Sequence, residues 1–299
     1  MSDDYLLLKV SVPREHAELV ESSMLDSGAV SCTYQDATDT PIHEPAPGTA
    51  PLWPEVIISG IYAPGTDPQS ASALLSTLIN PVTDAAITSE ILPDTDWERA
   101  WMEDFKPVKV AEKLWVVPTF CTAPDQSAIN IALDPGLAFG SGTHPTTHLC
   151  LQWLAKLDLN NKTVVDYGCG SGILAVAAAM MGASRVYAYD IDEQAFQATI
   201  DNAARNNVAD NITICHSDRD IPPNIDIVVA NILLAPLLEL GPRFRELLID
   251  QGELGMSGVL SAQVATLAEA YATQFRHTET AIRDQWAMYT AVTQGSMPT

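Results

Sequence analysis

The sequence is poor in basic residues. Fifteen lysines and arginines stand against 38 aspartates and glutamates, which gives a formal charge of -23. Phosphate backbones repel such a chain, so direct binding to bare nucleic acid is not expected. A basic protein or a cationic small molecule is the more natural partner. The alternative interpretation is an acidic surface that serves only solubility.

The sequence also lacks paired cysteines and long apolar runs. Its five cysteines are odd in number and contain no C-x-x-C pair, so neither a disulfide framework nor a zinc site is expected. The longest apolar stretch, residues 173–181, is too short to cross a bilayer. No basic signal-peptide region precedes the first apolar run. We therefore expect a cytoplasmic protein without metal or membrane contact.

What the sequence does contain divides into two parts. Residues 1–95 alternate apolar strands with helical repeats in the order β-α-β-β-α-β, which is typical of a ferredoxin-like α+β domain. Strands are expected at 5–12, 30–34, 56–62 and 87–92, with helices from 17 and over 68–79. Five prolines between residues 37 and 54 predict an irregular loop.

Acidic residues are concentrated in this first part. Residues 1–100 hold 3 basic and 16 acidic residues, a net charge of -13. The asymmetry indicates that the N-terminal third meets a cationic partner. Residues 96–106 then place Trp97, Trp101 and Phe105 on one face of a short linker helix, interpreted as a packing stripe. A contact of this stripe with cofactor or substrate is the alternative.

Residues 107–299 are expected to form the second domain. Short apolar strands at 163–167, 185–189, 212–215 and 225–230 alternate with helices at 172–181, 193–206 and 235–248. This alternation predicts an α/β fold with a doubly wound, mostly parallel, Rossmann-like sheet. A helix at 261–273 precedes two apolar stretches, 274–282 and 286–292, which suit a terminal antiparallel hairpin.

A glycine-rich loop follows the first of these strands. Residues 165–172 read Val-Asp-Tyr-Gly-Cys-Gly-Ser-Gly, with glycines at positions that include Gly168 and Gly170. Glycines allow close approach of a ligand to the backbone, and the following helix offers N–H groups. A dinucleotide fingerprint requires G-x-G-x-x-G, whereas this pattern is D-x-G-x-G-x-G. It resembles motif I of the class I S-adenosylmethionine-dependent methyltransferases. A plain strand-to-helix turn is the alternative.

Polar side chains end two further strands. Asp190 ends the second strand, where a carboxylate can accept both ribose hydroxyls of an adenosine. Asp192 is interpreted as the cap of the following helix. Asn231 ends the fourth strand, where amino-group methyltransferases carry N/D-P-P-Y/F. Here Ile-Leu-Leu follows, without the aromatic residue that stacks on a flipped base. A loop-capping amide is the alternative for Asn231.

The most specific stretch is residues 133–148, Leu-Asp-Pro-Gly-Leu-Ala-Phe-Gly-Ser-Gly-Thr-His-Pro-Thr-Thr-His. With the glycine loop and Val-Ala-Asn-Ile-Leu at 229–233, it resembles the ribosomal protein methyltransferases of the PrmA family. The resemblance extends to Gly28-Ala29-Val30-Ser31, Asp39-Thr40-Pro41, Trp97-Glu98-Arg99 and Trp101-Met102.

That resemblance implies S-adenosylmethionine as the cofactor, bound by Thr147, Gly168, Asp190 and Asn231, with Gly170 in the same loop. It also implies an N-terminal domain that recognises a basic large-subunit ribosomal protein, the one numbered eleven. Lysine side chains or the N-terminal amine of that protein would receive the methyl groups. We expect a monomer.

Other chemistry is not indicated. His144 and His148 lack a nearby carboxylate pair, so a metal site is not expected, and Cys169 lacks a positioned base, so it is interpreted as a small filler residue. No residue identifies itself as a general base. Two alternatives stay open: a methyltransferase of another basic protein, a nucleic acid or a small amine, and a nicotinamide-dependent oxidoreductase.

Overall fold

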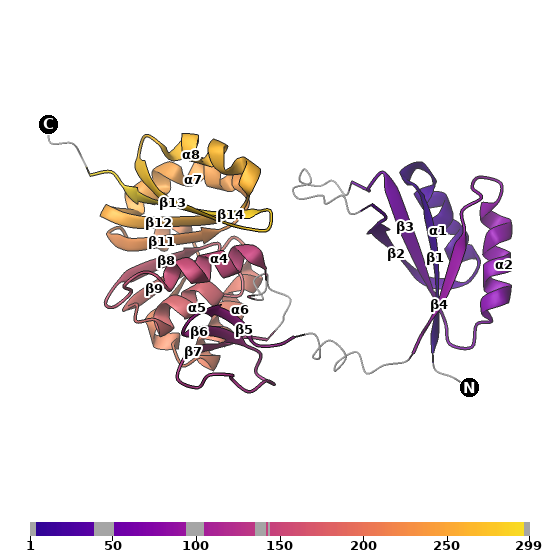
Figure 1. Ribbon diagram of the computed structural model, residues 1–299, viewed down its shortest axis with the longest axis horizontal. Coiled ribbons are helices and arrows are strands. Elements are labelled where there is room, and N and C mark those ends of the chain that lie inside the picture. The colour runs from indigo at the N-terminus through magenta and orange to yellow at the C-terminus, as the bar shows by residue number, and fades with distance from the viewer. Residues whose placement is uncertain (1–3, 39–50, 94–104, 135–141, 143, 296–299) are drawn as a thin grey trace. The chain divides into compact units, whose positions relative to one another are not determined.

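The computed structural model describes residues 4–38, 51–93, 105–134, 142 and 144–295 (Figure 1). It consists of two compact units, Met1–Met102 and Glu103–Thr299. The linker helix predicted for residues 96–106 lies outside the described residues except at its last two positions.

The first unit is a four-stranded antiparallel sheet with the order β2-β3-β1-β4. Because β3 lies between β1 and β2, the β1-α1-β2 segment is split by a third strand. The elements are β1 (Tyr5–Pro13), α1 (Ala17–Asp26), β2 (Ala29–Asp36), β3 (Glu55–Tyr62), α2 (Pro68–Ile79) and β4 (Ile87–Leu92).

The core of this unit forms where the sheet meets its two helices. Alternate residues of β1 point to one face, and four of them, Leu6, Leu8, Val10 and Val12, are buried. They pack with α1 and α2 in a single apolar cluster. Asp67 begins α2 by accepting a hydrogen bond from the Ser70 backbone N–H at 2.8 Å. The helices thus cover one face of the sheet (Figure 1).

The second unit is built on a seven-stranded sheet with the order β10-β9-β8-β11-β12-β14-β13. Strands β8 to β12 are parallel, and β14 is antiparallel to both of its neighbours. The strands are β8 (Thr163–Tyr167), β9 (Arg185–Tyr189), β10 (Ile212–Cys215), β11 (Ile225–Asn231), β12 (Leu248–Leu260), β13 (Phe275–Arg283) and β14 (Trp286–Thr293).

Helices cover both faces of this sheet (Figure 1). One apolar cluster joins it to α4 (Pro145–Leu154), α5 (Ile173–Met180) and α6 (Glu193–Arg205). A second cluster joins it to α7 (Leu234–Leu247) and α8 (Val264–Tyr271). The predicted α/β fold with a mostly parallel, doubly wound sheet is therefore confirmed.

Several elements of the second unit were not predicted. They are α4, the long central strand β12, and a separate three-stranded sheet of β5 (Val108–Ala111), β6 (Leu114–Val117) and β7 (Ile129–Ala132). The helix expected at 261–273 is shorter: a 3₁₀ turn, Ser261–Gln263, precedes α8. In the described ranges, no helix is long and apolar enough to span a membrane.

Candidate functional site

The predicted site residues converge on one edge of the parallel sheet. The glycine loop follows β8, Asp190 follows β9, and Asn231 is the last residue of β11. These strands are neighbours and parallel, so their carboxyl ends meet at the same edge. That edge is where open α/β sheets bind ligands.

The glycine loop is fastened to the end of β9. The backbone N–H groups of Gly168 and Cys169 donate to the Tyr189 carbonyl at 2.7 and 3.0 Å. Gly168 has a φ of +82°, and a Cβ there would lie 2.3 Å from Ile232 Cγ2. Packing by the protein itself therefore requires glycine at position 168, in addition to any ligand.

Asp190 is held against the glycine loop by backbone hydrogen bonds. Its Oδ2 accepts the N–H of Gly170 at 2.8 Å and its Oδ1 accepts the N–H of Asp192 at 3.0 Å. A carboxylate has about four lone-pair sites, so each oxygen keeps capacity for a ligand hydroxyl. Asp192 caps α6 by accepting the Gln194 N–H at 2.9 Å, and its interpretation as a helix cap is confirmed.

Asn231 lies beside Thr147. The amide nitrogen of Asn231 donates to Thr147 Oγ1 at 3.4 Å, across 84 residues of chain. Thr147 is buried in the first turn of α4, which His144 caps through Thr146. This contact joins the fourth parallel strand to the segment that carries the most specific sequence motif.

The two histidines of this segment are at least partly buried. His144 packs edge-on against Trp286, with ring centroids 5.0 Å apart. Burial lowers the pKa of His144 and of His148, and Arg283 adds to the effect on His148. Among the residues that the structure describes, no group of three or more histidine, cysteine or acidic side chains could hold a metal ion.

Asp166, the acid that precedes the glycine loop, is completely buried. Its Oδ2 accepts the Ala175 N–H at 2.9 Å, whereas its Oδ1 has no hydrogen-bond partner. Burial raises the pKa of Asp166 to about 7, and the charge of Asp190 contributes. An unpaired buried oxygen of this kind suits an ordered water.

Cys169 is not arranged as a nucleophile. Burial raises the pKa of its thiol above the ordinary range, and Asp166 adds to this effect. Its sulfur is 3.4 Å from Thr199 Oγ1 on α6. A protonated, buried thiol is unreactive, which agrees with the interpretation as a filler residue.

S-adenosylmethionine fits the chemistry of this edge. Its ribose diol needs a carboxylate acceptor, which Asp190 offers beside the loop. Its sulfonium and ammonium groups are cationic, and the carboxylate of Asp190 lies against the glycine loop. The polar groups at this edge therefore suit a cationic nucleoside.

Comparison with known proteins gives a consistent result. The family model described as "Ribosomal protein L11 methyltransferase (PrmA)" matches residues 4–294. Ribosomal protein L11 methyltransferases of Escherichia coli O8 (strain IAI1) and Salmonella newport (strain SL254) are each 44% identical over 288 residues. Each match covers 96% of this chain and 98% of the relative.

A solved structure is similar to part of the chain. The crystal structure of ribosomal protein L11 methylase from Lactobacillus delbrueckii subsp. bulgaricus is 31% identical, with a TM-score of 0.60. The match covers 64% of this chain and all of that one.

Proposed function

Because the chain belongs to the ribosomal protein L11 methyltransferase (PrmA) family, we propose that it transfers methyl groups from S-adenosylmethionine to amino groups of ribosomal protein L11. The observation that carries this conclusion is the family match over nearly the whole chain, with a glycine loop and Asp190 at the ligand-binding edge of the sheet. The protein is an S-adenosylmethionine-dependent protein methyltransferase. Lysine side chains and the N-terminal amine are the acceptors that fit this chemistry.

The cofactor-binding residues in this proposal are Thr147, Gly168, Gly170, Asp190 and Asn231. Asp190 accepts the ribose hydroxyls, and Gly168 and Gly170 leave the backbone at these two positions without side chains. Asn231 donates to Thr147, so its amide oxygen is left to accept an N–H of cofactor or substrate. The contacts of all five residues at one sheet edge support the assignment.

Methyl transfer at this edge of the sheet depends mainly on how the acceptor amine is aligned with the methyl group. Bound S-adenosylmethionine supplies an electrophilic methyl group, so the protein has to present a neutral amine in line with it. A lysine of pKa 10.4 costs about 4–5 kcal/mol to deprotonate at pH 7. Desolvation in the crevice lowers that cost, whereas nearby acids raise it. A transfer site lined by neutral groups such as Asn231 serves this purpose.

The first unit is assigned to recognition of L11. It carries the net charge of -13 within its first hundred residues, which suits a basic ribosomal protein. We place the enzyme in the cytoplasm as a monomer that does not bind nucleic acid directly.

The test is methylation of purified L11 by the full-length enzyme. Mass spectrometry should show an added mass of one or more methyl groups on L11 when S-adenosylmethionine is present and none when NAD replaces it. Calorimetry should show binding of S-adenosylmethionine and not of NAD. Methylation of RNA but not of L11 would contradict the proposed substrate.

A further inference from the structure

Helix α6 and its C-cap residue carry three buried polar residues. Thr199, Asn202 and Asn206 follow one another at helical spacing and are 0%, 8% and 8% exposed. Buried amides and hydroxyls require hydrogen-bond partners. Here the partners are backbone groups of two other segments, the glycine loop and strand β7.

The first segment is the glycine loop. Asn202 Nδ2 donates to the Ser171 carbonyl at 2.8 Å, and Thr199 Oγ1 donates to the Gly170 carbonyl at 3.3 Å. A Cβ at Gly172 would lie 2.6 Å from Thr199 Oγ1 and 2.9 Å from Thr199 Cα. The helix therefore rests directly on the loop and holds two consecutive carbonyls.

Holding these carbonyls sets the direction of the loop's N–H groups. In a trans peptide the C=O and the following N–H point in opposite directions. With these carbonyls turned toward α6, the N–H of Ser171 points away from the helix, and the N–H of Gly172 donates to the Cys169 carbonyl at 2.7 Å. The side chains of α6 thus hold the loop together with its hydrogen bonds to Tyr189 and Asp190.

The second segment is the end of β7. Asn206 brackets Ala132 with two hydrogen bonds: its Oδ1 accepts the Ala132 N–H at 2.7 Å and its Nδ2 donates to the Ala132 carbonyl at 2.9 Å. Asp134 accepts the N–H and hydroxyl of Thr119 at 2.7 and 2.8 Å.

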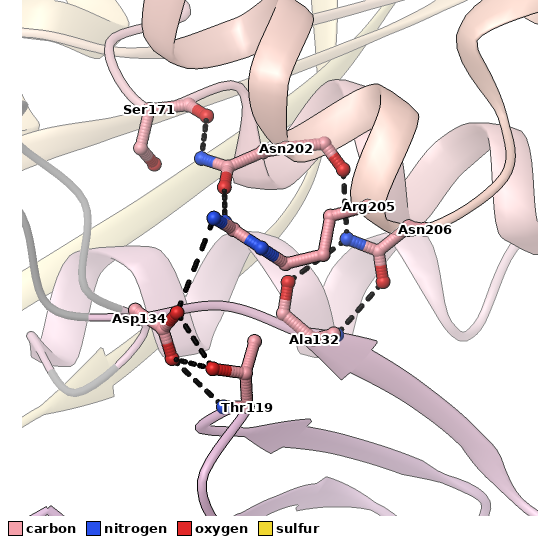
Figure 2. Close-up of polar contacts among 7 residues, drawn as sticks. All are labelled: Thr119, Ala132, Asp134, Ser171, Asn202, Arg205 and Asn206. Carbon is pink, nitrogen blue, oxygen red and sulfur yellow. Dashed lines mark hydrogen bonds and ion pairs between the residues drawn. The ribbon is translucent and has the colours of Figure 1, made fainter.

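Arg205 connects these two attachments (Figure 2). Its Nη1 donates to Asn202 Oδ1 at 2.5 Å, and its Nη2 lies 4.0 Å from Asp134 Oδ2. The Asn202 amide is thus fixed at both ends: its oxygen accepts from Arg205 while its nitrogen donates to the loop. This arrangement excludes the flipped amide, which would place oxygen against the Ser171 carbonyl.

We propose that Asn202 is a positioning residue for the cofactor loop, and that Asn202, Arg205 and Asn206 hold this loop in register with the end of β7. One helix thereby joins the glycine loop, which carries Gly168 and Gly170, to the end of β7. The inference rests on the proposed function, because it assigns the loop to S-adenosylmethionine.

The expected effect follows from one hydrogen bond. Asn202→Asp keeps the size of the side chain and the acceptor for Arg205, but places an oxygen against the Ser171 carbonyl. Asn202→Ala removes both contacts. Loss of one such bond corresponds to a Kd for S-adenosylmethionine about three- to ten-fold higher. The KM for L11 should not change.

The experiment uses the full-length enzyme and measures the Kd for S-adenosylmethionine by calorimetry well below the unfolding temperature. Tyr271→Phe is the matched control, because it removes another buried hydrogen bond of the same unit, from the Tyr271 hydroxyl to the Leu237 carbonyl at 2.7 Å. This control should lower Tm and leave the Kd unchanged. Arg205→Ala, at a side chain 37% exposed, should raise the Kd about two-fold without a risk to folding.

The outcomes separate the two proposals. A wild-type enzyme that fails to bind S-adenosylmethionine contradicts the proposed function. Wild-type binding combined with unchanged Kd in the Asn202 and Arg205 variants overturns the positioning role alone. If the Asn202 variants do not fold, the Arg205 variant decides: an unchanged Kd overturns the inference.

Discussion

The two units differ in how many faces of their sheets are covered by helices. In the first unit, helices cover one face of an antiparallel sheet, whose successive strands end at opposite edges. In the second, helices cover both faces, and five parallel strands end at the same edge. Only the second arrangement gathers strand-end side chains such as Asp190 and Asn231 in one place. The comparison supports our proposal that methyl transfer takes place in the second unit, while the first unit carries the greater density of negative charge.

The strongest test of this division removes the first unit. A chain that begins at Glu103 retains both cores of the second unit and all five proposed cofactor-binding residues. It should bind S-adenosylmethionine as the full chain does, yet methylation of L11 should be abolished because the crevice alone does not capture a folded protein. Near-normal turnover on L11, followed by mass spectrometry, would show that the recognition assignment is wrong.

A glycine in each unit sharpens the comparison. Gly168→Ala combines a positive φ with a Cβ 2.3 Å from Ile232, so it should cost at least about 2 kcal/mol of folding free energy and weaken cofactor binding. Gly65→Ala has a similar φ of +84° but no atom within 4 Å of the added Cβ. Gly65→Ala should lower the free energy of unfolding only by the strain of a positive φ at alanine. Urea unfolding of both variants measures the difference, and equal losses would contradict the packing argument.

Substitution of Asp190 tests whether this edge of the parallel sheet binds the cofactor. Asp190→Ala should raise the Kd for S-adenosylmethionine ten-fold or more, since each hydrogen bond to a charged acceptor is worth about 1.5–3 kcal/mol. The neighbouring Asp192→Ala removes only the cap of α6 and should cost about 1 kcal/mol of stability with unchanged affinity. Calorimetry on the two variants is the measurement. A folded Asp190→Ala protein with wild-type affinity would remove Asp190 from the site.

Asp166 gives the second unit a pH dependence. Its pKa is about 7 in the folded protein and has the ordinary value of 3.8 when unfolded, so between these values the folded state holds more protons. This contribution to stability is present below pH 4 and lost as pH rises through about 7. Relative to Asp166→Asn, the free energy of unfolding of the wild type should fall by up to about 1.4 kcal/mol per pH unit between about pH 4 and pH 7.

Urea unfolding of wild type and Asp166→Asn at several pH values measures this difference. Asp192→Asn, which alters an exposed carboxylate, is the control and should follow the wild type. Parallel curves for wild type and Asp166→Asn would mean that Asp166 titrates at its ordinary value.

The smallest expected effect concerns the charge of the first unit. If its acidic surface captures L11, binding of L11 should weaken several-fold as salt rises, since charges are screened beyond about 8 Å at physiological ionic strength. Binding of S-adenosylmethionine should change little. Titrations of both ligands at low and high salt make the comparison, and a salt-independent affinity for L11 would limit the acidic surface to solubility.

Much of the architecture is predictable because local patterns and packing agree. The strands at 163–167, 185–189, 212–215 and 87–92 and the helix at 68–79 have the predicted bounds. Strand β12 was missed because it contains three glycines, which disfavour strands. Two of them are required by distant parts of the chain. A Cβ at Gly255 would lie 2.5 Å from Trp153, and one at Gly258 would lie 2.2 Å from the Ile232 carbonyl.

Some residues of the candidate site can likewise be predicted from the sequence, and others cannot. Asp190 and the glycine loop are evident from the sequence because each follows a strand directly. Asn202 and Asn206 were not found, since their partners are backbone groups 31 and 74 residues away and leave no local pattern. Polar residues at helical spacing on α6 look like a solvated face until the fold shows what they contact.

The position of β14 has a consequence for synthesis on the ribosome. This strand lies between β12 and β13, yet it follows both in the chain, and Thr293 at its end accepts the Gly252 N–H and donates to the Ile249 carbonyl. Until β14 emerges, the nascent chain exposes an unpaired edge of β12, a hazard for aggregation. The first unit can fold early, whereas the sheet that carries the site closes only after its last strand has left the exit tunnel.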